Sequence, residues 1–228
     1  ANTTGAENVA VGANAGDANT TGNNNVFVGR DAGTANTTAG NNTFVGERAG
    51  AANTTGDESV AVGQFAYSAN TTGVDNVAMG RSALAANTTA NFNVAIGRAT
   101  LSTNTTGAKN SALGTQAGGA LTTGSENTFL GYQAGTHNTS LTTGGGNTIL
   151  GAYSDADAAD TAQAIVIGYD VTGTSSTTTL GSGSSDIRAA HGSATWSTIS
   201  DERVKKDITD ATAGLSFIND LKPKTFKY

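Results

Sequence analysis

The sequence contains no cysteine, only one proline, and few charged or aromatic side chains. Without cysteine, neither a disulfide nor a thiolate-bound metal can hold the fold together. Charged residues make up 13% of the 228 residues and aromatic residues 6%, so a conventional globular domain is poorly supported. No apolar run is long enough to cross a bilayer. The net charge of −6 disfavours binding to nucleic acid through its phosphates.

What the sequence has instead is a repeat. Glycine recurs every 17 residues, with one step of 20. The period glycines are Gly12, Gly29, Gly46, Gly63, Gly80, Gly97, Gly114, Gly131, Gly151 and Gly168. A fixed short period is typical of a stacked architecture in which each repeat packs only on its neighbours. We therefore expect about ten rungs of 17 residues over residues 1–169.

Each repeat contains a short apolar segment just before its period glycine. The last residue of this segment is large and aliphatic, as at Val28, Val45 and Ile96. The residue two earlier is usually Val or Thr and shares its face, because side chains alternate along a strand. The residue between them, for example Phe27, is also apolar but points the other way. A rung of two short strands and two turns encloses only one of these faces, so the other needs a partner. Sister chains around a rotational axis are the simplest partner.

Glycine and asparagine occupy the other recurrent positions. Period glycines such as Gly29, Gly46, Gly80 and Gly97 suit tight corners that need positive φ or close backbone approach. Asparagine recurs four residues before most period glycines, at Asn8, Asn25, Asn42, Asn76, Asn93, Asn110, Asn127 and Asn147. Stacked in register, these amides are expected to form a hydrogen-bonded ladder along the rod. The Asn-Thr-Thr segments are expected to be stacked, turn-forming polar residues.

The repeat resembles two known patterns. Residues 58–63, Glu-Ser-Val-Ala-Val-Gly, are similar to the Ser-Val-Ala-Ile-Gly repeat of trimeric autotransporter adhesin heads. The Asn-Thr-Thr-Gly-x-x-Asn form resembles repeats in phage tail-fibre proteins. The resemblance implies a homotrimer of left-handed parallel β-rolls. It is specific for architecture and says little about a ligand.

The C-terminal end resembles a different family. Residues 200–208, Ser-Asp-Glu-Arg-Val-Lys-Lys-Asp-Ile, are similar to the start of the intramolecular chaperone domain (peptidase family S74) of phage tail spikes and fibres. In that family the domain drives trimer assembly and is then released by self-cleavage beside the serine. Carried over, Ser200 is the nucleophile and Lys205 its general base, since a desolvated lysine can have a lowered pKa. The alternative is that Ser200 caps a turn and Lys205 is solvated.

No other catalytic or metal-binding pattern stands out. His137 and His191 lie far apart in the sequence, which argues against a metal site. The cluster at residues 155–160 contains three aspartates without EF-hand spacing and is expected to be a solvated acidic loop. Trp196 is expected to be a packing residue. No cofactor is expected.

The sequence therefore predicts an all-β protein in three parts. Residues 1–169 form the repetitive β-roll, 170–199 an irregular β connector, and 200–228 the truncated start of a mixed α/β chaperone domain. The favoured function is a structural and adhesive homotrimeric fibre, a phage tail fibre on the virion. Its partners would be a host cell-surface glycan or protein and other tail or baseplate proteins, with recognition favoured at residues 137–146 and the connector. Neither nucleic-acid binding nor membrane insertion is expected.

Three alternatives stay open from the sequence. The first is a trimeric adhesin on a bacterial cell surface, which would share the architecture. The second is an ice-binding solenoid, since ranks of Thr-Thr could order water. The third is an enzyme acting on an external polysaccharide, for which no convergent carboxylate pair is visible.

Overall fold

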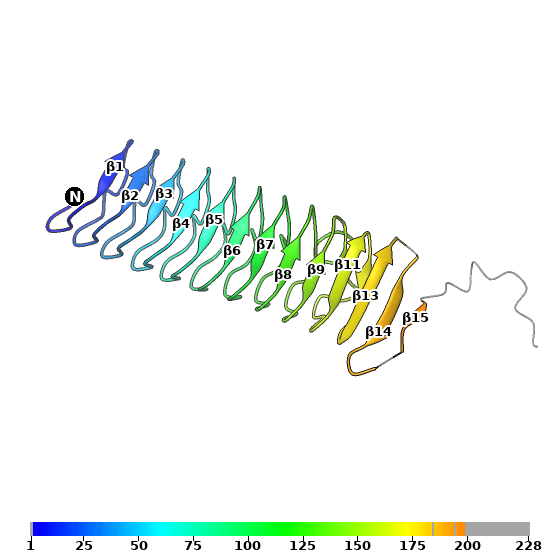
Figure 1. Ribbon diagram of the computed structural model, residues 1–228. Helices are drawn as coiled ribbons and strands as arrows, with labels where there is room; N and C mark the ends of the chain where they lie inside the picture. Colours follow the sequence, from blue (N-terminus) through cyan, green and yellow to red (C-terminus); the bar gives the residue numbers. More distant parts are fainter. Residues whose placement is uncertain (1, 184, 194, 199–228) are drawn as a thin grey trace, which may run out of the picture.

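The protein is a parallel β-solenoid of about ten turns. A computed structural model describes residues 2–183, 185–193 and 195–198 (Figure 1). The elements within these residues are all strands, which confirms the predicted all-β fold class. The left-handed winding, the trimer and the α/β start of the chaperone domain stay predictions, the last because residues 199–228 lie outside the described part.

The strands are short and follow the repeat. The first nine are β1 (Val9–Val11), β2 (Val26–Val28), β3 (Thr43–Val45), β4 (Val60–Val62), β5 (Val77–Met79), β6 (Val94–Ile96), β7 (Ser111–Leu113), β8 (Thr128–Leu130) and β9 (Thr148–Leu150). The later ones are β10 (Asp155–Ala156), β11 (Ile165–Tyr169), β12 (Thr172–Gly173), β13 (Thr177–Ser182), β14 (Ile187–Ala190) and β15 (Ser197–Thr198). Neighbours in β1 to β9 pair in parallel with identical repeat positions opposite one another.

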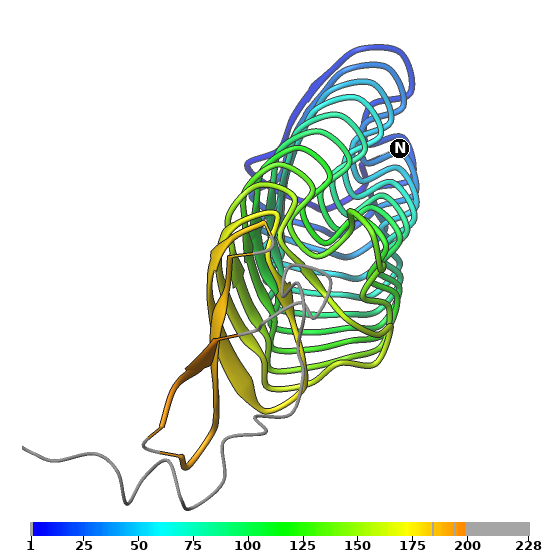
Figure 2. The ribbon, with the colours of Figure 1, turned by 90° about the vertical axis from the view of Figure 1, so that its right-hand side faces the viewer.

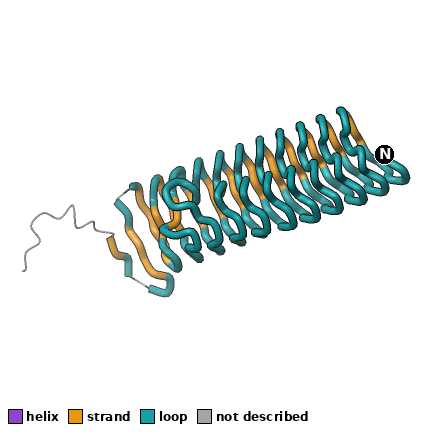
Figure 3. The backbone as a smooth tube through the Cα atoms, turned by 180° about the vertical axis from the view of Figure 1, so that it is seen from behind, coloured by secondary structure: helices purple, strands orange, loops and turns teal. Residues whose placement is uncertain are grey.

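One strand per turn is the rule, and the expected second strand is wrong for most rungs. Figure 3 shows a single row of strands along the rod, with loops making up the rest of each turn. The cause is positive φ at alternate residues after the strand, for example at Gly46, Arg48 and Gly50. This backbone cannot form a regular strand, although it still bonds to the next rung. A second, two-stranded sheet, β10 with β12, appears only near the end of the solenoid.

The sheet continues beyond the last repeat. β13 pairs in parallel with β11, and β14 and β15 then add in antiparallel orientation. Figure 2, turned by 90° from Figure 1, shows successive turns with the same outline stacked along the rod and this last hairpin at its end. Trp196 precedes β15 and is 52% exposed. The expectation that it packs is therefore wrong within the described chain.

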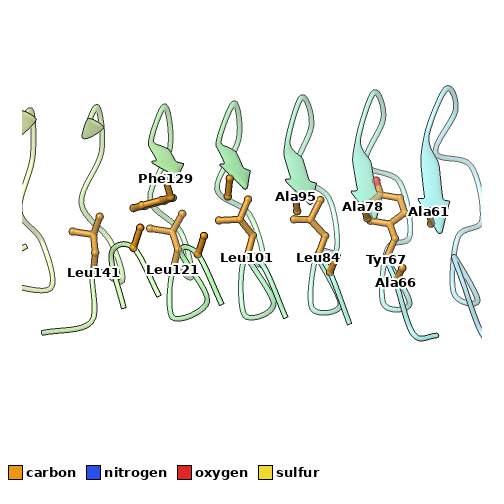
Figure 4. Close-up of a cluster of buried hydrophobic side chains, with 14 of the residues drawn as sticks. Ala61, Ala66, Tyr67, Ala78, Leu84, Ala95, Leu101, Leu121, Phe129 and Leu141 are labelled. Atoms are coloured by element: carbon orange, nitrogen blue, oxygen red, sulfur yellow. The ribbon is translucent and has the colours of Figure 1, made fainter. Parts of the chain in front are cut away.

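The core inside the solenoid is filled by a size exchange between its two walls. The central residue of each strand from β2 to β9, like Val166 of β11, points inward and is buried. Where this residue is phenylalanine, the residue six positions later is glycine: a Cβ at Gly33 would lie 2.5 Å from the Phe27 ring. Where it is alanine, a large side chain such as Leu84 enters from the opposite wall at three rungs (Figure 4), whereas Ala112 is followed by a glycine that makes room for the phenylalanine of the next rung. Large side chains on one wall therefore meet small residues on the other, which is how the narrow core is filled.

This exchange predicts a compensating pair of substitutions at Ala61 and Tyr67. Tyr67→Gly leaves a cavity and is expected to cost about 3–5 kcal/mol, reduced a little because Tyr67 holds a φ of 55°. Ala61→Phe collides with Tyr67 and is also destabilising. The double variant reproduces the setting of Phe27, which has glycine on both sides, because Gly50 already lies on the other side of position 61. It should therefore be more stable than either single variant. Denaturant unfolding midpoints measure this. Additive losses in the double variant would contradict the size-exchange account.

Candidate functional site

A stripe of mostly apolar side chains runs along the outer face of the solenoid's sheet. We define the outward stripe as the first and third residues of β1 to β9 together with Ile165 and Ile167 of β11. Val28, Val45 and Ile96 lie here and are half-buried, whereas Leu113 and Leu130 are 49% and 44% exposed. The enclosed face is thus the one made by the central residues, and the outer face is left open in a single chain.

The stripe is continuous and uncharged. Its members are Val, Ile, Leu, Met, Thr or Ser at every rung, and parallel pairing places them one above another along the rod. Exposed apolar patches of this kind mark interaction surfaces on soluble proteins. Each rung adds one small apolar surface, and stacking the rungs makes these surfaces one stripe along the rod.

The period glycines set the corner at one edge of the stripe. Gly29, Gly46, Gly80 and Gly97 have φ values of 131°, 134°, 128° and 131°. A Cβ at Gly46 would lie 2.6 Å from the carbonyl oxygen of Gly63 in the next rung. Only glycine fits this conformation and this close stacking of backbones.

Asparagine amides fix the vertical register on the inside of the other edge. Asn25, Asn42, Asn76 and Asn93 are buried, and their series runs from Asn8 to Asn147 with Ser59 at one rung. Each side-chain oxygen accepts the backbone N–H of the equivalent residue one rung on, as in Asn42 N to Asn25 Oδ1 at 3.0 Å. Each amide nitrogen donates to a backbone carbonyl, as in Asn42 to Gly56 at 2.9 Å. The ladder therefore provides hydrogen-bond partners both for buried backbone groups and for the asparagine side chains themselves.

A second ladder is formed by the first residue of each Asn-Thr-Thr segment. Asn36 donates to Asn19 Oδ1 at 3.0 Å, and the same bond repeats up the rod as far as Asn104. The hydroxyl of the following threonine donates to the carbonyl of its equivalent in the next rung, as in Thr37 to Thr54 at 3.0 Å. The second threonine, for example Thr38, is exposed. From Asn19 to Asn104, each Asn-Thr-Thr thus contributes one buried, one half-buried and one exposed position to its turn.

The inserted residues 137–146 are held by a buried carboxylate. Asp155 is 1% exposed and accepts the backbone N–H groups of Asn138 at 2.7 Å and Thr139 at 2.8 Å. Burial raises the pKa of the Asp155 carboxyl, and these hydrogen bonds oppose the rise. The expectation of a solvated acidic loop is therefore wrong for Asp155. The carboxylate thus supplies the acceptor for two backbone N–H groups of the insertion.

Beside this loop lies an aromatic cluster that the sequence analysis missed. The Tyr153 ring lies 5.3 Å from the Tyr132 ring, 5.7 Å from the Tyr169 ring and 4.5 Å from the His137 ring, centroid to centroid. Tyr132 and Tyr169 are 43% and 57% exposed. The sequence does contain a signal for this cluster, because each of three successive period glycines is followed within two residues by a tyrosine.

The predicted catalytic pair cannot be placed. Ser200 and Lys205 lie outside the described residues, so their geometry is not part of the site described above. Among the described residues, no group of three or more His, Asp or Glu is arranged to hold a metal ion. The same residues contain no helix of the length and apolar character needed to cross a membrane.

Comparison with known proteins adds one finding. Residues 200–228 match the peptidase S74 family, described as the chaperone of endosialidase. No curated protein and no solved structure matches the chain. The family match and the β-solenoid together support a fibre- or tailspike-like protein.

The second asparagine ladder predicts unequal costs for the same substitution at two rungs. Asn70 donates to Asn53 and accepts from Asn87, so Asn70→Leu orphans buried groups and should cost about 1–3 kcal/mol. Asn104 is the last member, and its Oδ1 is buried without a partner because Leu121 follows in the next rung. Asn104→Leu only moves the end of the ladder by one rung and should cost less than about 1 kcal/mol. Equal unfolding midpoints for the two variants would contradict this account.

Proposed function

We propose that the protein is the shaft of a homotrimeric fibre, in which three copies bury their outward stripes against one another. The observation that supports this is the uncharged, mostly apolar surface that runs the length of the solenoid and that no described element of the chain covers. Burying such a face is favourable by roughly 25 cal/mol per Å². Because every rung presents the same surface, a copy of the same rod is the partner that matches it along its whole length.

The match at residues 200–228 favours three copies. The chaperone domain that this segment resembles assembles trimers of tail spikes and fibres, and the same stoichiometry would apply to the solenoid that precedes it. Ser200 and Lys205 would then act as the nucleophile and base of self-cleavage after assembly. The bond beside Ser200 is the expected site.

A phage tail fibre is the setting that best fits these features, with the protein on the virion and joined to other tail or baseplate proteins. Its receptor would be a glycan or protein of the host cell surface. The surface that supports recognition is the aromatic cluster beside residues 137–146, because exposed tyrosines offer an apolar face and a hydroxyl together. A bacterial surface adhesin would use the same architecture, and a membrane anchor elsewhere in its gene would identify it.

The trimer predicts that a charge on the outward stripe prevents assembly. Leu113 is 49% exposed, so Leu113→Lys can be solvated in a single chain, whereas in the trimer it would bury three like charges near one axis. Light scattering should show the mass fall from three chains to one. Thr106→Lys adds the same charge to an exposed position of the same rung and should leave the mass unchanged. A trimeric Leu113→Lys variant would exclude the stripe as the interface.

Recognition by the aromatic cluster can be tested on an array of bacterial surface polysaccharides. We expect binding to at least one polysaccharide, and a loss of at least tenfold in affinity for Tyr132→Ala combined with Tyr153→Ala. Phe65 occupies the repeat position of Tyr153 in another rung, so Phe65→Ala is the matched control and should bind normally. Equal loss in both variants would exclude a specific role for the cluster.

Ice binding stays an alternative because of the exposed threonines. Thr38, Thr55, Thr72, Thr89 and Thr106 are all exposed and recur at identical repeat positions. Such a row presents regularly spaced hydroxyl and methyl groups to water. Thermal hysteresis in a solution of the purified chain would support this function. Its absence, with a three-chain mass, would leave the fibre as the better account.

A further inference from the structure

The outward stripe is bordered by two rows of residues that differ in character. The leading flank comprises the residues two positions before each strand of the stripe: Glu7, Asn24, Asn41, Glu58, Asp75, Phe92, Lys109, Glu126, Gly146 and Gln163. The trailing flank comprises the residues that follow each period glycine: Ala13, Arg30, Glu47, Gln64, Arg81, Arg98, Thr115, Tyr132, Ala152 and Tyr169. Each rung therefore has one residue of each flank, on either side of its two stripe residues.

The two flanks have opposite charge. The leading flank has four acidic residues and one lysine, whereas the trailing flank has three arginines and one glutamate. The minority charges are neutralised by neighbours on their own flank: Lys109 Nζ lies 3.1 Å from Glu126 Oε1, and Glu47 pairs with Arg30. What remains is acidic on one side, notably Glu58 and Asp75, and basic on the other, Arg81 and Arg98.

Among the described residues, these remaining charges form no ion pair. Asp75, Arg81 and Arg98 are exposed. Phe92, on the leading flank at the rung of Arg98, is 54% exposed. Exposed charges are common on the surfaces of proteins and do not by themselves indicate an interface. Here they line the two borders of an apolar interface surface, with opposite signs on opposite borders.

We propose that the leading flank of each copy packs against the trailing flank of the next, so that the three chains run parallel and in register. This inference rests on the proposed trimer and specifies its geometry. In the central rungs, Asp75 meets Arg81 of the neighbouring copy. One rung on, the guanidinium of Arg98 from the neighbouring copy lies over the Phe92 ring as a cation–π contact.

The signs of the charges select this arrangement over its rival. Rotation about an axis along the rod brings a leading flank to a trailing flank, and in register the opposite charges of Asp75 and Arg81 meet while no rung joins like charges. In an antiparallel association, each flank meets its own kind, and the arginines of the trailing flank face one another. Charge complementarity of this sort contributes mainly to specificity, because like charges brought together are costly. A parallel trimer also places the last described strand, β15, of all three copies at one end of the fibre.

Introduced cysteines test the contact directly, because the chain has none of its own. In Asp75→Cys/Arg81→Cys, the two cysteines of one chain are six residues apart across a strand, roughly 15–20 Å. This exceeds the Cα separation of about 7 Å that a disulfide allows. Mild oxidation of the full chain should therefore give a covalent three-chain species on non-reducing denaturing gels.

Two controls separate the possible arrangements. Asp75→Cys alone and Arg81→Cys alone should stay at the one-chain mass, because neither flank meets itself. Thr72→Cys/Arg81→Cys places the first cysteine on the same rung but on the exposed threonine row, and should also stay uncrosslinked. Covalent dimers from either single variant would overturn the proposal in favour of antiparallel contact.

The mass of the unoxidised protein distinguishes failure of the flank pairing from failure of the proposed trimer. A three-chain mass without crosslinks in Asp75→Cys/Arg81→Cys would overturn the flank pairing and leave the trimer standing. A one-chain mass for the parent would overturn both. As a second variant, Asp75→Arg should lower the three-chain fraction at least severalfold at low salt, and Asp75→Arg/Arg81→Asp should restore it. Failure of this charge exchange to restore assembly would also contradict the pairing.

Discussion

In-register stacking is the constraint on which this structure depends. Every residue of a rung lies next to its own equivalent in the rungs above and below, so each position must be compatible with itself. Asparagine meets this condition because its amide both donates and accepts, and the two interior ladders use it in that way. Period glycines meet it because their backbones stack more closely than a Cβ would allow. Charged residues do not meet it easily, which accounts for their scarcity in the chain.

Self-compatibility also explains how so few apolar residues make a core. A rung does not need its own large side chain on each wall, only one large residue opposite a small one. Phe27 opposite Gly33 and Leu84 opposite Ala78 are two solutions that occur in one rod. The remaining apolar residues are then free to lie on the outer face. The stripe, the flanks and the proposed assembly all follow from this division of residues between the inner and outer faces of one short strand.

The sequence predicted much of this because its information is periodic. Val28, Phe27 and their equivalents in the other repeats indicated the period, the position of the strand and the apolar character of both its faces. It did not predict the single strand per turn, because positive φ at residues such as Arg48 and Leu84 has no compositional mark. Nor did it predict the burial of Asp155, whose partners belong to a loop inserted one rung earlier. A periodic pattern predicts only those contacts that recur at every rung, so contacts made at a single rung could not be predicted from it.

The central claim is that the outer face of the sheet is an interface between identical chains. The most direct test is the solution mass of the unmodified chain, measured by light scattering over a range of concentrations. The account predicts three times the 22.5 kDa of a single chain, independent of concentration in the micromolar range. A mass of 22.5 kDa throughout would contradict it, because the stripe would then be stable while exposed to water.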